Sequence, residues 1–195
     1  MPLTVGFTGH RPNRLRVGAE VIERRIGEVL RLVVADRSGS NIAVSALAEG
    51  SDRMFARAAL GQGFALHALF PFKTGDYVTT FGDAHAMPEF ERLLAKAKQV
   101  DVCPGSLDDD AAAYEVCGHY IVDRSDVLVT VWDGKLAAGR GGTTDILAYA
   151  LAQSTPVVWV SAVEDRQARV LNGTTELAMS AAEPVGPVWI DSFST

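Results

Sequence analysis

The stretch that decides the fold joins an apolar run to a glycine-rich turn. The run is Val127-Leu128-Val129-Thr130-Val131-Trp132, the turn is Gly139-Arg140-Gly141-Gly142-Thr143-Thr144-Asp145, and an amphipathic stretch begins at Ile146. A glycine turn between a buried strand and a helix presents bare backbone N–H groups to a phosphate, and the helix N-terminus adds partial positive charge. The turn lacks both G-x-G-x-x-G and the Lys-Ser/Thr pair of a P-loop. It predicts an α/β fold with an anion-binding turn of another kind.

The same alternation of strand and helix extends along the chain. Apolar runs predict strands at 3–8, 42–47, 64–70, 100–103, 127–132 and 156–160, and helical spacing predicts helices at 20–33, 51–60, 88–97, 108–121 and 146–153. Residues 73–87 lack periodicity and are expected to form a loop. Beyond residue 161 the pattern weakens, with a hairpin turn expected at Asn172-Gly173 and a short strand at 188–190.

Alternating strands and helices predict parallel βαβ units. We therefore expect an α/β, single-domain, Rossmann-like, doubly wound and mostly parallel sheet with helices on both faces. This domain would span 1–195, with a core at about 3–161 and an irregular C-terminal extension at 162–195.

The composition limits the class of protein. The 195 residues are 48% hydrophobic and 22% charged, which is typical of a soluble globular chain. A net charge of -6, with only a short Arg-rich segment at 11–16, argues against a nucleic-acid partner. Two cysteines without a C-x-x-C pair indicate reduced, small core residues. Without a signal-peptide pattern or a long apolar segment, we expect a cytoplasmic protein that does not bind membranes.

Glycine and polar residues gather where the predicted strands end. In doubly wound folds, ligands bind at the carboxyl ends of the strands, near a switch in strand order. We therefore expect one cleft that holds a ligand and its phosphate. Its predicted residues are Gly9, His10, Arg11, Gly50, Ser51, Asp133, Gly141, Gly142, Thr143 and Thr144.

Several of these residues also have ordinary structural interpretations. His10 is as compatible with a surface position as with a ligand contact. Arg11 is compatible with a pair to a surface carboxylate, but its place beside a glycine turn at a strand end favours an anion. Asp52 is expected mainly to cap the helix that follows it, and Asp133 is compatible with either a cap or a sugar contact. The remaining histidines, His67, His85 and His119, show no metal-ligand spacing, so neither a metal nor a cofactor is expected.

Taken in order, these segments resemble the SLOG superfamily, the Rossmann-like group that unites DNA-processing protein A with the Lonely-guy phosphoribohydrolases, once called lysine decarboxylase-like. The resemblance is carried by Thr8-Gly9-His10-Arg11-Pro12, Leu47-Ala48-Glu49-Gly50-Ser51-Asp52-Arg53, Phe70-Pro71-Phe72, Ser125-Asp126-Val127-Leu128-Val129, and Trp132-Asp133-Gly134 through Gly142-Thr143. It is strongest to the branch of predicted bacterial nucleotide sensors. The resemblance implies that a nucleotide or nucleotide derivative binds at the glycine-rich turn.

The resemblance does not extend to the hydrolase residues of the Lonely-guy enzymes. Those enzymes use an Arg in a His-Glu-Arg-Lys helix and the Glu of P-G-G-x-G-T-x-x-E, and the corresponding registers here fall near Cys117 and at Ile146. If the protein is nevertheless an enzyme, Glu49 and Asp145 are the candidate catalytic carboxylates.

Two functions therefore stand as hypotheses. The first is a nucleotide sensor that signals through its own oligomer or through a protein partner. The alternative is a phosphoribohydrolase-like N-glycosidase or ribosyl-transfer enzyme that acts on nucleotides. Single-stranded DNA binding is disfavoured by the net charge. Homo-oligomer formation is expected from the resemblance and from the apolar residues Phe81, Met87 and Trp189, which lie in segments without an evident core role.

Overall fold

A computed structural model describes residues 2–34, 39–83, 86–136, 140–171 and 183–184. In chain order its strands and helices are β1 (Thr4–Gly9), η1 (Pro12–Arg14), α1 (Ala19–Val33), β2 (Ile42–Ser45), α2 (Ser51–Gly61), β3 (Ala65–Phe70), α3 (Thr74–Val78), α4 (Met87–Leu94), β4 (Gln99–Val102), η3 (Leu107–Asp109), α5 (Asp110–Asp123), β5 (Val127–Trp132), α6 (Thr143–Ala152), β6 (Val157–Ser161), β7 (Arg169–Leu171) and β8 (Glu183–Pro184). This order confirms the predicted α/β alternation.

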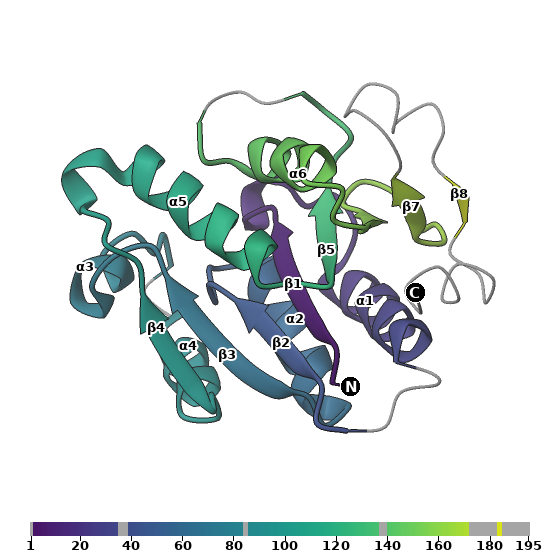
Figure 1. Cartoon of the computed structure of the whole chain (residues 1–195), viewed down its shortest axis with the longest axis horizontal. Helices are drawn as coiled ribbons and strands as arrows, with labels where there is room; N and C mark the ends of the chain where they lie inside the picture. Colours follow the sequence, from purple (N-terminus) through teal and green to yellow (C-terminus); the bar gives the residue numbers. More distant parts are fainter. Residues whose placement is uncertain (1, 35–38, 84–85, 137–139, 172–182, 185–195) are drawn as a thin grey trace.

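One mostly parallel sheet organises the described part of the chain. Its eight strands lie in the order β4-β3-β2-β1-β5-β6-β7-β8. The pairs from β4 across to β6 are parallel, whereas β7 runs antiparallel to β6, and β8 to β7. The Rossmann-like, doubly wound architecture expected from the sequence is confirmed (Figure 1).

Helices cover both faces of this sheet. Helices α1 and α2 pack together on one face, and α5 and α6 pack together on the other (Figure 1). Strand β5 shows why its sequence lacks polar alternation: Val127, Val129 and Val131 enter the core cluster shared with α1 and α2, while Leu128 and Trp132 enter the cluster shared with α5 and α6. A strand buried on both faces must be apolar throughout.

The order of the strands reverses direction between β1 and β5. From β1 the sheet grows through β2, β3 and β4 on one side, and through β5 and β6 on the other. The connections that leave the carboxyl ends of β1 and β5 therefore cross opposite faces of the sheet, which leaves a crevice between them. This crevice is where the structure brings the predicted strand-end residues together.

Three local predictions differ from the structure. The expected loop at 73–87 contains helix α3, which is held by aromatic packing: the ring centroid of Tyr77 lies 5.3 Å from that of Phe70 and 5.8 Å from that of Phe72. Helix α6 begins at Thr143, earlier than Ile146. The C-terminal stretch, expected to be irregular, contributes β7 to the sheet. The turn at 172–173 and the strand at 188–190 lie outside the described residues.

The apolar residues behind the expected oligomer are less exposed than the sequence indicated. Phe81 and Met87 are partly buried and pack against the core that contains α1 and α2. They therefore have core roles, and they give no support to an oligomer interface. Trp189 lies outside the described residues.

Across the described ranges, every helix is too short or too polar to cross a bilayer.

Candidate functional site

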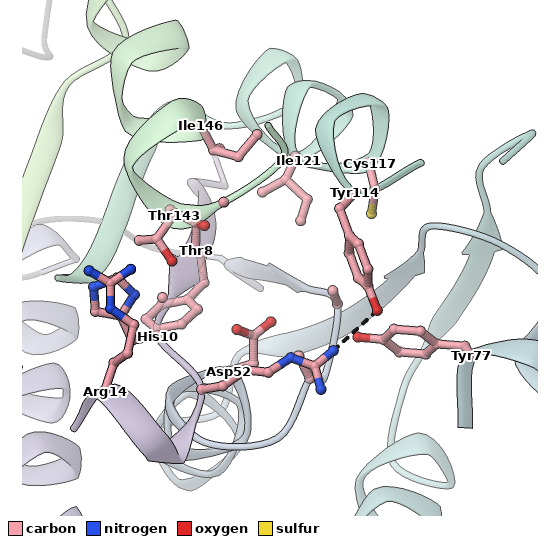
Figure 2. A pocket seen from close by; sticks show the side chains of 18 of the residues that line it. Thr8, His10, Arg14, Asp52, Tyr77, Tyr114, Cys117, Ile121, Thr143 and Ile146 are labelled. Atoms are coloured by element: carbon pink, nitrogen blue, oxygen red, sulfur yellow. Dashed lines mark hydrogen bonds between the residues drawn. The ribbon is translucent and has the colours of Figure 1, made fainter. Parts of the chain in front are cut away.

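A cavity of about 310 Å³ lies at the carboxyl end of β1 (Figure 2). Its walls come from the end of β1 with the following loop, the connection from β2 to α2, helices α3 and α5, and the first turn of α6. The lining residues are Phe7, Thr8, Gly9, His10, Arg11, Asn13, Arg14, Ala46, Ala48, Asp52, Tyr77, Tyr114, Cys117, Gly118, Ile121, Gly141, Gly142, Thr143 and Ile146. The loop after β1 and the glycine turn before α6 therefore share one cavity.

The glycine turn leads into α6 through two different backbone conformations. Gly141 has φ +74, and a Cβ there would overlap the carbonyl oxygen of Ala111 at the start of α5. Gly142 is the N-cap of α6 with φ -83 and ψ 169, a conformation open to any residue. Among the described residues, the N–H groups of Gly142, Thr143 and Thr144 donate no hydrogen bond. The first turn of α6 thus offers donors at the cavity wall.

On the β1 side, His10 and Arg14 converge on Asp133. Arg14 donates from Nη2 and Nε to Asp133 Oδ2, at 2.6 and 3.1 Å. His10 Nε2 lies 3.0 Å from Asp133 Oδ1, outside hydrogen-bond geometry. His10 is buried, so the alternative of a surface histidine is wrong.

Burial and mutual contact set the charges of His10 and Asp133. Burial lowers the pKa of His10 more than its contact with Asp133 raises it, and the charge of Arg14 lowers it further. Burial raises the pKa of Asp133, but the contact with His10 and the hydrogen bonds from the Lys135 amide and from Arg14 outweigh burial and leave this pKa below its usual value. At neutral pH the cavity therefore faces a neutral imidazole and a guanidinium that is held in place by a carboxylate.

Arg11 spans the opposite side of the cavity mouth. Its guanidinium donates to the Thr80 carbonyl at 3.1 Å, to the Tyr114 hydroxyl at 3.1 Å and to Glu49 Oε2 at 3.4 Å. Glu49 also accepts the backbone N–H groups of Gly82 and Asp83, at 2.8 and 3.0 Å. Arg11 and Glu49 together tie the loops after β1 and β2 to the segment after α3.

Two buried polar side chains point into the interior of the cavity (Figure 2). Asp52 accepts a hydrogen bond from the Ser45 hydroxyl at 3.0 Å. Burial raises the pKa of Asp52 to about 6, against the opposing effects of Ser45, Arg11 and the Ala48 and Ala46 amides. The hydroxyl of Tyr77 is buried and has no hydrogen-bond partner among the described residues. Neither residue was predicted as part of the site.

The structure brings six of the ten predicted ligand residues to the cavity wall, namely Gly9, His10, Arg11, Gly141, Gly142 and Thr143. The other four, Gly50, Ser51, Asp133 and Thr144, do not line it. Ser51 Oγ donates to the His10 carbonyl at 2.8 Å. Thr144 Oγ1 donates to the Lys135 carbonyl at 3.0 Å and accepts from Trp132 Nε1 at 2.9 Å. These residues shape the loops around the cavity.

Neither candidate catalytic carboxylate lines the cavity. Glu49 is occupied by the hydrogen bonds described above. Asp145 Oδ2 accepts the N–H of Gly141 at 2.9 Å, which closes the glycine turn on itself. Asp52 is the carboxylate that does line the cavity, and it had been assigned mainly to capping; in the structure, no side chain caps α2.

Some of the missed residues had a signal in the sequence. Asp52 belongs to the polar run that follows a predicted strand, and Arg14 lies in the one Arg-rich segment. Tyr77 had none, because its place depends on α3 folding back over the strand ends. The two cysteines are both buried and free, as predicted.

No protein-family model matches this chain, and no curated protein matches it. Over the part of the chain that the structure describes, no three His, Cys, Asp or Glu side chains gather as metal ligands do. The cavity and its side chains are therefore the basis for assigning a function.

Proposed function

We propose that this protein binds a nucleotide or a nucleotide-derived ligand in the cavity, with a phosphate against the first turn of α6, and acts as a sensor. The observation that carries this proposal concerns the N–H groups of Gly142 and Thr143 at the start of α6, which have no hydrogen-bond partner among the described residues. They line the same cavity as Arg14. A helix N-terminus combined with an arginine is a favourable environment for a phosphate.

Arg14 is well prepared for this role. Its Nε and Nη2 hold Asp133, and in the described part of the chain its Nη1 makes no hydrogen bond. An ionised Asp133 keeps the guanidinium oriented, so less side-chain entropy is lost when a phosphate binds. The neutral His10 beside it can donate or accept one further hydrogen bond without adding charge.

The remainder of the wall suits an organic ring system. Phe7, Ile121 and Ile146 present apolar surface, and Gly118 lets α5 approach Ile146 of α6 closely. Small-molecule sites are usually concave, mostly apolar and supplied with a few placed polar groups. A phosphate carried on a sugar or a base matches this division better than inorganic phosphate alone.

A sensor is favoured over the N-glycosidase alternative. Glycosidic cleavage requires a pair of carboxylates at the reacting bond, but Asp52 is the one carboxylate among the lining residues, and Glu49 and Asp145 are held outside the cavity by other hydrogen bonds. We therefore expect a bound nucleotide to remain intact. A sensor of this kind passes on its state through its own oligomer or through a protein partner. Sedimentation with and without ligand would detect a change in the oligomer.

The phosphate position is tested by Thr143→Glu with Thr143→Gln as its control. A carboxylate in the first turn of a helix is compatible with folding, but it would repel a phosphate there. With a panel of nucleoside mono- and diphosphates, we expect thermal shifts for the wild type and for Thr143→Gln, and none for Thr143→Glu. Equal shifts in all three proteins would contradict the assignment of the phosphate to α6.

The fate of the ligand separates the two functions. Protein is incubated with each nucleotide that binds, and the products are separated by chromatography. Intact nucleotide is expected. Release of free base at enzymatic rates, lost in Glu49→Gln or Asp145→Asn, would replace the sensor by the glycosidase.

A further inference from the structure

We infer that Asp52 and Tyr77 form a second subsite of the cavity, which binds the hydroxyl groups of the ligand's sugar. This inference rests on the proposed function, because it presumes that the ligand's phosphate lies at the start of α6. It adds the chemical class of the ligand: a phosphorylated sugar with free hydroxyls, as in a ribonucleotide.

The first observation is the unsatisfied hydroxyl of Tyr77. This side chain is fully buried, yet its oxygen has no hydrogen-bond partner among the described residues, and it points into the cavity (Figure 2). A buried hydroxyl without a partner costs free energy, so a residue that could be Phe for packing alone implies a partner supplied by a ligand. Tyr77 can both donate and accept, as a sugar hydroxyl does.

The second observation is the carboxylate of Asp52, which points into the same space (Figure 2). Its neighbours come from every side: Ser45 from β2, Arg11 from the loop after β1, Tyr77 from α3 and Cys117 from α5. The Ser45 hydroxyl donates to the carboxylate, and the backbone amides of Ala46 and Ala48 lower its pKa. The Asp52 carboxylate is therefore held as a hydrogen-bond acceptor, so a ligand group that binds it must be a hydrogen-bond donor.

Charge narrows the choice of donor. A phosphate at this end would meet the Asp52 carboxylate, which repels it. A cation would meet the Arg11 guanidinium, which is close enough to Asp52 to lower its pKa. A neutral donor fits both neighbours, and adjacent sugar hydroxyls can satisfy Asp52 and Tyr77 together. The two ends of the cavity thereby set the direction of the ligand.

The pH dependence has a definite sign. Burial raises the pKa of Asp52 to about 6. Hydroxyls that donate to the carboxylate bind its ionised form, so affinity should be complete above this pKa and fall below it. Between pH 7.5 and pH 5 we expect affinity to fall about tenfold, because only about a tenth of Asp52 is ionised one unit below its pKa.

Three probes test the subsite by calorimetry at pH 7.5: inorganic phosphate, ribose 5-phosphate and 2-deoxyribose 5-phosphate. We expect ribose 5-phosphate to bind most tightly and the deoxy sugar about tenfold more weakly. Asp52→Asn should weaken ribose 5-phosphate by about ten- to a hundredfold, and Tyr77→Phe by about fivefold. Neither variant should weaken inorganic phosphate.

Tyr77→Phe also guards against a folding artefact. Because the hydroxyl has no partner in the described structure, this variant should keep or raise the melting temperature while it loses sugar affinity. Tyr149→Phe is the matched control, since Tyr149 donates to Asp123 outside the cavity and should not affect any probe. If Tyr77 had only a structural role, Tyr77→Phe would lower the melting temperature and leave the affinity for the sugar phosphate unchanged.

The two proposals fail in different ways. If phosphate binds but the sugar phosphate binds no more tightly, or if both variants bind it as the wild type does, the subsite is overturned and the phosphate site stands. If none of the three probes binds, the proposed function falls, and the subsite falls with it.

Discussion

Helices α2 and α6 begin in the same way and end up in opposite environments. Each follows a parallel strand and a glycine in the left-handed region, Gly50 with φ +93 and Gly141 with φ +74. At α2, the N–H and the hydroxyl of Ser51 both donate to the His10 carbonyl, at 3.3 and 2.8 Å. At α6, the first N–H groups lie at the cavity wall without partners in the described residues.

The difference shows that a glycine turn before a helix is not by itself a ligand site. The loop after β1 crosses the start of α2 and supplies the acceptor that a phosphate would otherwise provide. Helix α6 lies across the switch in strand order from α2, so that loop leaves its first turn uncovered. The sequence favoured the turn at 139–145 as the phosphate site, but it also predicted Gly50 and Ser51 as ligand residues because they too follow a predicted strand.

The largest loss of stability is expected from disturbing the start of α2, which we call closed because the loop after β1 covers it; the uncovered start of α6 is called open. Gly50→Ala would place a Cβ 2.9 Å from the His10 carbonyl oxygen and from Pro12 Cδ, in a backbone conformation that disfavours side chains. We expect a loss of about 3 kcal/mol in the free energy of unfolding. Urea denaturation measures it. An unchanged midpoint would show that the loop after β1 does not press on α2.

Asp52 lies in the first turn of the closed helix and should make stability depend on pH. Its pKa is raised from 3.8 to about 6 in the folded protein, so folded protein binds the proton more tightly than unfolded protein. The stability contributed by the protonated form is therefore full below pH 3.8 and lost as pH rises through 6. Asp52→Asn removes this dependence.

The variant should consequently gain stability relative to the wild type between pH 4 and pH 6.5, by about 2 kcal/mol. Denaturation curves at both pH values measure the gain. A constant difference between the two proteins would mean that the pKa of Asp52 is not raised by burial.

Removing one hydroxyl from the first turn of α2 and one from the first turn of α6 compares how much each contributes to stability. Ser51→Ala removes a buried hydrogen bond to the His10 carbonyl and should cost about 1–2 kcal/mol. Thr143→Ala should change stability by less than about 0.5 kcal/mol, because Thr143 makes no side-chain hydrogen bond in the described structure. Equal losses in thermal unfolding would contradict the distinction between a closed and an open helix start.

The smallest effect is expected at Gly142. Its φ of -83 and ψ of 169 are open to any residue, so Gly142→Ala should stay within about 0.5 kcal/mol of the wild type. Gly141→Ala, with φ +74 and the Ala111 carbonyl against the new Cβ, should lose clearly more. If the two variants prove equally stable, the turn has another conformation in solution.

The sequence by itself determined the layers of this protein. Apolar runs such as 127–132 alternate with stretches of helical spacing. Both faces of such a strand carry apolar side chains, so helices must bury the sheet on both faces. The same reasoning put the ligand residues at the strand ends, and it placed Gly9, His10 and Arg11 beside Gly141, Gly142 and Thr143. These predictions depend on periodicity and chain direction, which are local properties.

Only the tertiary structure decided which groups face the cavity. Tyr77 reaches it because α3 packs on Phe70 and Phe72, aromatic contacts that no periodic pattern announces. Asp52 faces the interior while Glu49, three residues earlier, turns to the amides of Gly82 and Asp83. Hydrogen-bond partners and burial arise between segments far apart in the chain, so the raised pKa of Asp52 and the open start of α6 belong to the fold.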